Sequence, residues 1–228
     1  MPRDVGVVVV AAGRGVRAGG GVPKQFREVA GVPLVLRALR PFTAHPDVAQ
    51  VALVLPGESV ASPPAWLAEL GGGAITLVAG GAERSDSVRA GLAALGSECR
   101  TVLVHDGARP FVDRALVDAV IEAARAGVGA VPAIPVGDTL KQVGTDGRSI
   151  ERTVSREQLW RAQTPQGFPR AMLAAAYADG AGRAATDDAG MVEAAGGEVR
   201  IVPGSARNIK VTSPDDFVLA EQLALAAR

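Results

Sequence analysis

The chain has 228 residues, which is within the range of one large α/β domain and gives ample length to bury a core. Its 24 basic and 24 acidic side chains cancel, which excludes the global positive field that nonspecific nucleic-acid binding uses, so any positive site must be local. A single cysteine excludes a disulfide framework and a multi-cysteine metal site, as is typical of a reducing cytosol. We find no basic leader and no apolar stretch of membrane-spanning length, so we expect one soluble, cytoplasmic domain over residues 1–228 without a nucleic-acid or membrane partner.

The first predicted element is a buried strand, Val7–Val10, which leads directly into a Gly-rich loop. The loop carries Arg17, and Lys24 follows it. Glycines allow backbone amides to approach an anion closely, while arginine and lysine supply positive charge. The stretch is therefore predicted to bind phosphate groups.

Apolar strands and amphipathic helices alternate along the rest of the chain. Strands are expected at 51–55, 75–78, 101–104, 129–134 and 199–202, and helices at 34–42, 66–70, 85–95 with Ser85 as N-cap, 114–126, 169–177, 186–195 and 214–227. This alternation predicts an α/β, Rossmann-like fold, with a mostly parallel sheet and helices on both faces. In such sheets ligands bind at the carboxyl ends of the strands, where the loops at Gly13, Gly81 and Asp106 should converge.

One segment interrupts the alternation. Residues 138–154 have mixed polarity and an Asp-Gly turn, which predicts a β-hairpin, and we define residues 137–156 as the arm. A lone hairpin has too little apolar surface to be stable, so the arm is expected to contact a second subunit. A short strand is also expected at 208–212.

The Gly-rich loop permits more than one interpretation. Residues 13–18 satisfy the dinucleotide pattern G-x-G-x-x-A after a strand. However, the loop continues to Lys24 without turning promptly into a helix, and no acidic residue closes a second strand about 20 residues on. The Walker phosphate loop is also excluded, since no G-K-[ST] is present. A longer phosphate loop with two cations remains, beside the alternative of a flexible, solvated turn.

Several blocks, distributed over nearly the whole chain, resemble one enzyme family. In chain order they are residues 11–17, 23–26, 80–88, 105–110, 138–139, 164–166, 186–188 and 208–212. Together they are similar to the bacterial 2-C-methyl-D-erythritol 4-phosphate cytidylyltransferases of non-mevalonate isoprenoid synthesis. The resemblance implies transfer of CMP from CTP to methylerythritol phosphate with release of pyrophosphate.

The resemblance also implies roles for individual residues. Arg17, Lys24 and Lys210 would be catalytic, because they would hold the triphosphate and the transition state. The nucleotide side would consist of Ala11, Ala12, Gly13, Gly15, Gly81 and Ser87, and the acceptor side of Asp106, Arg109 and Thr164. Thr139 and Arg156 match arm positions that reach the substrate bound in the neighbouring subunit, which implies a homodimer.

Magnesium is expected to bind through the phosphates of CTP, with no protein residue assigned as a ligand, because Mg²⁺ prefers hard oxygen ligands and retains waters. Ala82 stands where several relatives carry an acid, which leaves one nucleotide contact open.

Three motifs also have structural interpretations. Asp106 could be a helix N-cap. His105 is interpreted as structural, because adjacent residues on a strand point in opposite directions and would not form a dyad with Asp106. Residues 186–188 are interpreted as a helix cap in preference to a metal site.

Two alternative functions remain at this stage. Ribitol 5-phosphate cytidylyltransferases have similar loops and a similar linear acceptor, and the difference between acceptors is decided by pocket shape. The second alternative function is a module that binds a nucleotide without catalysing a reaction. The chain ends soon after its last predicted helix, so a fused cyclodiphosphate synthase domain, which some relatives carry, is not expected.

Overall fold

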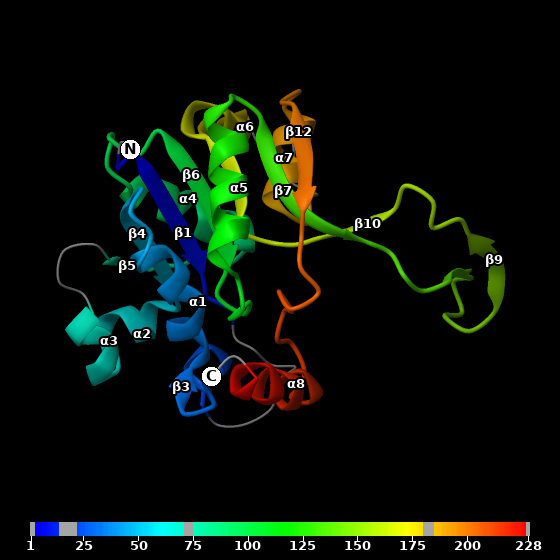
Figure 1. Ribbon diagram of the computed structural model, residues 1–228, viewed down its shortest axis with the longest axis horizontal. Helices are drawn as coiled ribbons and strands as arrows, with labels where there is room; N and C mark the ends of the chain where they lie inside the picture. The colour runs from blue at the N-terminus through cyan, green and yellow to red at the C-terminus, as the bar shows by residue number, and fades with distance from the viewer. Residues whose placement is uncertain (1–2, 14–21, 71–74, 180–184, 227–228) are drawn as a thin grey trace.

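The central sheet of the computed structural model has the strand order β10-β7-β11-β6-β1-β4-β5, with β12 paired to β7 (Figure 1). The structure describes residues 3–13, 22–70, 75–179 and 185–226. The strands are β1 (Val5–Val10), β4 (Val48–Leu55), β5 (Ile75–Ala79), β6 (Thr101–Asp106), β7 (Gly129–Pro135), β10 (Trp160–Ala162), β11 (Gln166–Pro169) and β12 (Val199–Pro203).

The pairing confirms the predicted mostly parallel sheet. Strand β1 pairs in parallel with β4 on one side and with β6 on the other, so that Val10 lies opposite both Val54 and Asp106. The antiparallel strands β10 and β11 were not predicted, because both are short and lie in a polar stretch. Strand β11 lies between β6 and β7 and ends the parallel run.

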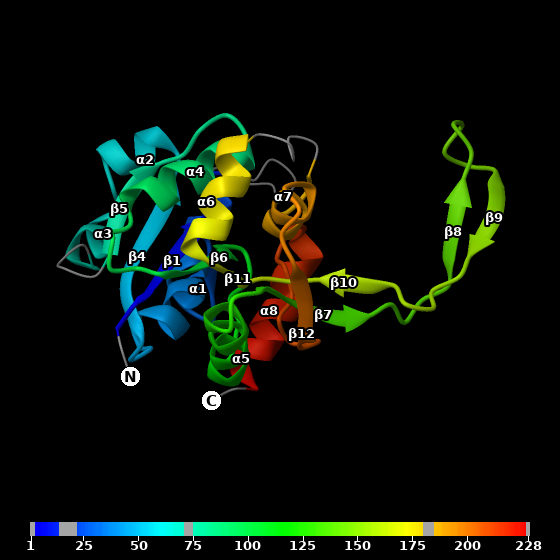
Figure 2. The same ribbon diagram turned by 90° about the horizontal axis from the view of Figure 1, so that it is seen from above.

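Helices cover both faces of the sheet, as predicted. Helices α1 (Leu34–Thr43) and α5 (Arg114–Arg125) pack on one face, and α4 (Arg84–Ala94), α6 (Arg170–Asp179) and α7 (Asp188–Ala194) pack on the other. Figures 1 and 2 show α5 on the opposite side of the sheet from α6.

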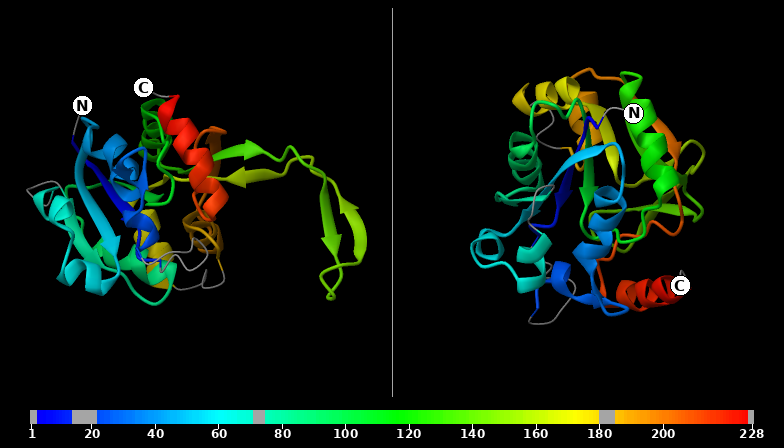
Figure 3. Two further views of the ribbon diagram at one scale, coloured as in Figure 1. Left: turned by 90° about the horizontal axis from the view of Figure 1, so that it is seen from below. Right: turned by 60° about the vertical axis from the view of Figure 1, so that its left-hand side comes forward.

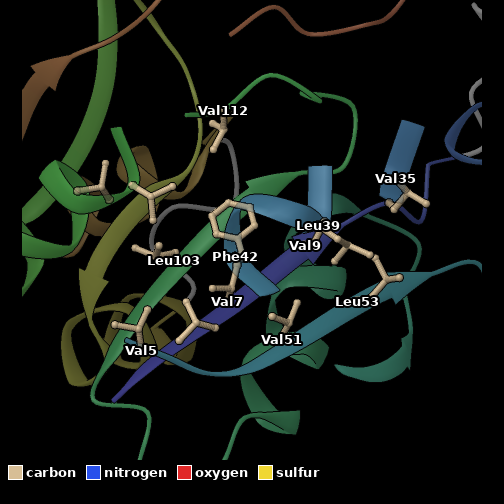
Figure 4. Close-up of a cluster of buried hydrophobic side chains, with 14 of the residues drawn as sticks. Val5, Val7, Val9, Val35, Leu39, Phe42, Val51, Leu53, Leu103 and Val112 are labelled. Carbon is tan, nitrogen blue, oxygen red and sulfur yellow. The ribbon is translucent and has the colours of Figure 1, made fainter. Parts of the chain in front are cut away.

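Strand β1 is buried from Val5 to Val9 and contributes side chains to both hydrophobic cores. Val7 and Val9 point into the cluster with α1 and α5, whereas Val8 joins the cluster beneath α4 and α6. Figure 4 shows Val7 and Val9 near Leu39 and Phe42 in the first cluster. Because both faces are buried, the strand is continuously apolar, which is the pattern that predicted it.

A third, smaller cluster holds the C-terminal helix against the segment that follows the Gly-rich loop. Helix α8 (Pro214–Leu225) packs on the two-stranded hairpin of β2 (Glu28–Val29) and β3 (Val32–Pro33). The guanidinium of Arg27 lies 3.9 Å from the ring centroid of Phe217, and the backbone N–H of Ala30 donates to both Glu221 carboxylate oxygens at 2.9 Å. The remaining elements are η2 (Lys24–Phe26), α2 (Gly57–Ala61) and α3 (Ala65–Leu70).

The predicted hairpin is present and extends away from the rest of the chain (Figures 2 and 3). It consists of β8 (Leu140–Val143) and β9 (Ile150–Val154). The turn between them is fixed by Asp146, whose carboxylate accepts hydrogen bonds from the backbone N–H groups of Arg148 and Ser149 at 2.9 Å. Val143 and Ile150 are 46% and 62% exposed, so the arm has an uncovered apolar surface within this chain.

Two predictions of local structure are wrong. Helix α4 begins at Arg84, with Glu83 as N-cap, because the side chain of Asp86 accepts from the backbone N–H of Glu83 at 3.2 Å. Residues 208–212 form no strand, because Asn208 N–H and Ile209 N–H donate to Ser205 O and Arg207 O within a local turn. Among the described residues, no helix has the length and apolar character needed to cross a membrane.

Candidate active site

The loops after β1, β5 and β6 lie side by side at the carboxyl edge of the sheet. Strand-like hydrogen bonds continue into them: Ala11 N–H donates to Val54 O at 2.8 Å, Gly80 N–H to Leu55 O at 2.8 Å, and Gly107 N–H to Val10 O at 2.9 Å. The predicted convergence of these loops is therefore confirmed.

The first two loops make close contact. A Cβ atom on Gly80 would lie 2.4 Å from Ala12 Cβ and 2.8 Å from Ser87 Oγ, so only glycine permits this approach. The 2% exposed Ser87 accepts a hydrogen bond from Gly81 N–H at 3.3 Å. Ala12 therefore lies against Gly80 and Ser87, and Ser87 is bonded to Gly81. Binding of a nucleotide by Ala11, Ala12, Gly13, Gly81 and Ser87 stays a prediction. Gly15 and Arg17 lie outside the described residues.

A carboxylate and three cations form the second part of the site. Asp106 Oδ2 lies 2.8 Å from Lys210 Nζ and 3.7 Å from Arg109 Nε, and Asp106 Oδ1 lies 3.5 Å from Arg84 Nη2. Burial by itself would raise the pKa of Asp106, but Lys210 and Arg84, with Arg109, outweigh it and hold the pKa well below its usual range. Asp106 is therefore ionised, and the helix N-cap interpretation is wrong, because Asp113 caps α5 by accepting from Leu116 N–H at 2.8 Å.

The C-terminal segment is fixed against the end of β6. Val211 N–H donates to Ala108 O at 2.8 Å, and Arg109 Nη1 donates to Asn208 O at 2.8 Å. Lys24 Nζ donates to Val211 O at 2.9 Å. Two lysines that are far apart in the sequence, Lys24 and Lys210, are thereby brought to the same edge of the sheet.

Thr164 and His105 contact each other and the backbone at the end of β6. The backbone N–H of Asp106 donates to Thr164 Oγ1 at 3.0 Å, and Thr164 Oγ1 lies 3.1 Å from His105 Nδ1. His105 Nε2 lies 3.0 Å from Arg109 O and must carry the proton, because a carbonyl can only accept. His105 is completely buried and bonded at both nitrogens, which confirms its structural role.

The stability of the protein should depend on pH through His105. Burial lowers the pKa of His105 to about 4, so between about pH 6.5 and 4 the unfolded chain binds a proton that the folded chain does not. The contribution is fully present above pH 6.5 and is lost as the pH falls through this window, by about 1.4 kcal/mol per pH unit. Urea unfolding at about pH 6.5, 5.5 and 4.5 should show a decline that is shallower in His105→Gln. Equal slopes in the two proteins would contradict this.

A cavity of about 210 Å³ opens beside these groups. Its lining residues are Arg84, Asp106, Arg109, Ala162, Gln163, Thr164, Gln166, Thr186, Asp187 and Lys210. The predicted acceptor-side residues Asp106, Arg109 and Thr164 therefore share one cavity with Lys210. Arg84, which the sequence analysis placed in a motif without assigning it a role, also lines this cavity.

Residues 186–188 form a cap, as predicted. Asp187 precedes α7 and accepts from Gly190 N–H at 2.9 Å. Asp188 is fully buried and binds Arg84 and the hydroxyl of Tyr177. Within the described ranges, no group of three His, Cys, Asp or Glu side chains could hold a metal ion.

Thr139 and Arg156 are exposed residues of the arm, and neither lines the cavity. Figure 2 shows the β8–β9 hairpin of the arm extending away from the sheet. Arg156 donates to the carbonyl of Gly137 across the base of the arm. One chain does not bring these two residues to Asp106 and Lys210.

A mostly parallel α/β sheet with loops and lysines gathered at its carboxyl edge is a nucleotide-binding type of α/β fold. Solved structures that superpose on it are cytidylyltransferases, which have the nucleotidyltransferase fold. The model of the IspD family, 2-C-methyl-D-erythritol 4-phosphate cytidylyltransferase, matches residues 5–225. The chain belongs to this family.

Individual proteins that are similar to this chain carry the same family name. A 2-C-methyl-D-erythritol 4-phosphate cytidylyltransferase of Frankia casuarinae is 46% identical, over 96% of this chain and 80% of the relative. A bifunctional IspD/IspF enzyme of Rhodospirillum rubrum is 47% identical over 96% of this chain, which spans only 56% of that relative's length. The crystal structure of the cytidylyltransferase from Thermus thermophilus superposes with a TM-score of 0.80 at 39% identity, covering 96% of this chain and 98% of that one.

Proposed function

We propose that this chain transfers CMP from CTP to 2-C-methyl-D-erythritol 4-phosphate. An oxygen of the acceptor's phosphate attacks the α-phosphorus of CTP, the bond to the β-phosphate oxygen breaks, and pyrophosphate leaves. The observation that carries the proposal is the placement of Lys210, 2.8 Å from Asp106, beside a segment that Lys24 binds through Val211 O. Both lysines thus lie at the strand ends that carry the Gly-rich loops.

The proposed reaction fits this set of side chains. A phosphate monoester carries up to two negative charges near neutral pH, so the nucleophile needs no general base. The reaction needs alignment and neutralisation of negative charge, which positioned cations supply. Lys24 and Lys210, with Arg17, are proposed to stabilise the triphosphate and the transition state, and the amides of residues 11–13 to contact the cytosine.

Magnesium is proposed to bind on the triphosphate. Two carboxylates line the cavity: Asp106 has Lys210, Arg84 and Arg109 around it, and Asp187 accepts hydrogen bonds from Gly190 N–H and Gln166 Nε2. Both carboxylates thus already have donors, and the protein presents cations to the substrates. The donor set therefore fits a metal held by phosphate oxygens and water. When bound, the ion would neutralise part of the triphosphate charge.

The active site is proposed to be shared in a homodimer that works in the cytoplasm. Thr139 and Arg156 lie on an arm that extends from the body, with the apolar side chains of Val143 and Ile150 exposed. A second copy that covers this surface would allow the arm to reach the neighbouring cavity. The low cysteine usage supports the cytoplasm.

Turnover with two acceptors tests the function. Pyrophosphate release should require both CTP and methylerythritol phosphate, with a much higher kcat/KM than for ribitol 5-phosphate. A preference for ribitol 5-phosphate would overturn the acceptor assignment. Binding of CTP without pyrophosphate release with either acceptor would favour the non-catalytic module.

A further inference from the structure

A buried carboxylate that the proposed chemistry does not use lies behind the acceptor cavity. Asp188, in the first turn of α7, has no exposed surface. It accepts hydrogen bonds from Arg84 Nη2 at 2.7 Å, from Arg84 Nη1 at 3.1 Å and from the Tyr177 hydroxyl at 2.6 Å. A forked pair with a third donor fixes the guanidinium in one orientation.

Arg84 connects this buried acid to Asp106. The nitrogen that lies 2.7 Å from Asp188 Oδ2 also lies 3.5 Å from Asp106 Oδ1. The other oxygen of Asp106 lies 2.8 Å from Lys210 Nζ. Asp106 Oδ1 is thus paired with Arg84, whereas Oδ2 is paired with Lys210 and, at 3.7 Å, with Arg109 Nε. Without Arg84, the Asp106 carboxylate could rotate and carry Lys210 with it.

We propose that Arg84, held by Asp188 and Tyr177, is a positioning residue that orients Asp106 and thereby places Lys210 for CMP transfer. This inference rests on the proposed function, because Lys210 is taken as the cation at the α-phosphate. Asp188 itself does not line the cavity that contains Lys210, so its effect must pass through Arg84.

Stability alone is a weak reason for this arrangement. Taking two charges out of water costs about as much as their attraction returns, so buried ion pairs add little net stability. Burial by itself would lower the pKa of Arg84, but the negative charges of Asp188 and Asp106 outweigh it and raise the pKa above its ordinary value, so Arg84 stays charged between the two carboxylates.

A double-mutant cycle tests the proposal. In the full chain, Asp188→Asn should lower kcat by about 10- to 100-fold, as expected for a small misplacement of a catalytic group, while KM for CTP changes little. In a Lys210→Ala background, measured in single turnover, Asp188→Asn should change the rate by less than about twofold, because the group that it positions is gone. An equal loss in both backgrounds would show a merely structural role and overturn the proposal.

Two further variants distinguish the positioning role of Arg84 from a general effect of misfolding. Arg84→Lys keeps the charge but loses the fork, and it should reproduce the kcat loss and its dependence on Lys210. Arg114→Lys is the matched control, because Arg114 is an exposed helix arginine that pairs at 3.6 Å with Asp118 on α5, on the opposite face of the sheet from Tyr177. It should leave kcat unchanged. A comparable kcat loss in the control would contradict the assignment to Arg84.

A second readout does not need activity. The rate of acylation of the Lys210 amine can be followed by mass spectrometry of its peptide. Acylation should be about two- to fivefold faster in Asp188→Asn than in the parent protein, because loosening the half-exposed Lys210–Asp106 ion pair would free the amine. An unchanged rate would overturn the positioning role. A parent without transferase activity but with this rate difference would refute the proposed function and leave the Arg84 link intact.

Discussion

Lys210→Ala is expected to lower kcat by about 10²- to 10³-fold, as removal of one charge-stabilising donor does in other active sites. The dissociation constant of CTP should change far less. Lys210 Nζ lies 2.8 Å from Asp106, at the edge where the proposed function places the acceptor phosphate and the triphosphate, so its charge should matter most when negative charge develops. Stopped-flow measurement of pyrophosphate release and calorimetric titration of CTP separate the two effects.

A second lysine and an exposed arginine provide the comparison for this variant. Lys24→Ala should show a loss of the same order, because Lys24 is fixed to the same segment through Val211 O. Arg200→Ala removes an exposed cation on β12 that pairs with Glu198 at 2.8 Å and does not line the cavity, so it should retain kcat. Near-normal turnover of Lys210→Ala would refute its catalytic role.

Mixing two inactive variants is expected to restore about a quarter of the parent activity, because random exchange of a symmetric dimer gives half heterodimers with one intact site each. The variants are Lys24→Ala, which lacks a cation of its own site, and Arg156→Ala, which lacks the arm contact to the neighbour's site. In the heterodimer, the Arg156→Ala subunit keeps Lys24 and receives the intact arm. Activity should be followed during subunit exchange.

Exchange itself must be demonstrated, for example by native mass spectrometry of subunits with different tags. A mixture of two variants both carrying Lys24→Ala is the control and should stay inactive. Complete exchange without recovery would contradict the shared site and indicate that the arm acts on its own chain.

Much of the sheet was predictable because its strands are buried on both faces. The run Val7–Val10 can be predicted as a strand without knowing which strands pair with it, since a continuous apolar segment between turns is typical of a central parallel strand. Strands β10 and β11 have only three and four residues, and their pairing with β7 and β6 depends on long-range register, so local pattern did not predict them.

The candidate site was predictable where motifs carry the chemistry. The pairing of Asp106 with Lys210 joins residues that are distant in the sequence, and only the resemblance to a family linked the two before the structure. Asp188 was assigned to a helix cap, and nothing in its neighbours indicated that it would bind Arg84, which lies on a different helix. Contacts of this kind depend on how α4 and α7 pack on the same face.

The central claim, that the site at the carboxyl edge joins CMP to the acceptor's phosphate, is tested most directly by phosphorus NMR of the full chain with CTP, Mg²⁺ and methylerythritol phosphate. The account predicts a new diphosphate diester signal that grows in step with pyrophosphate and is absent without the acceptor. Conversion of CTP to CMP and pyrophosphate by hydrolysis, with the acceptor's monoester signal unchanged, would contradict it.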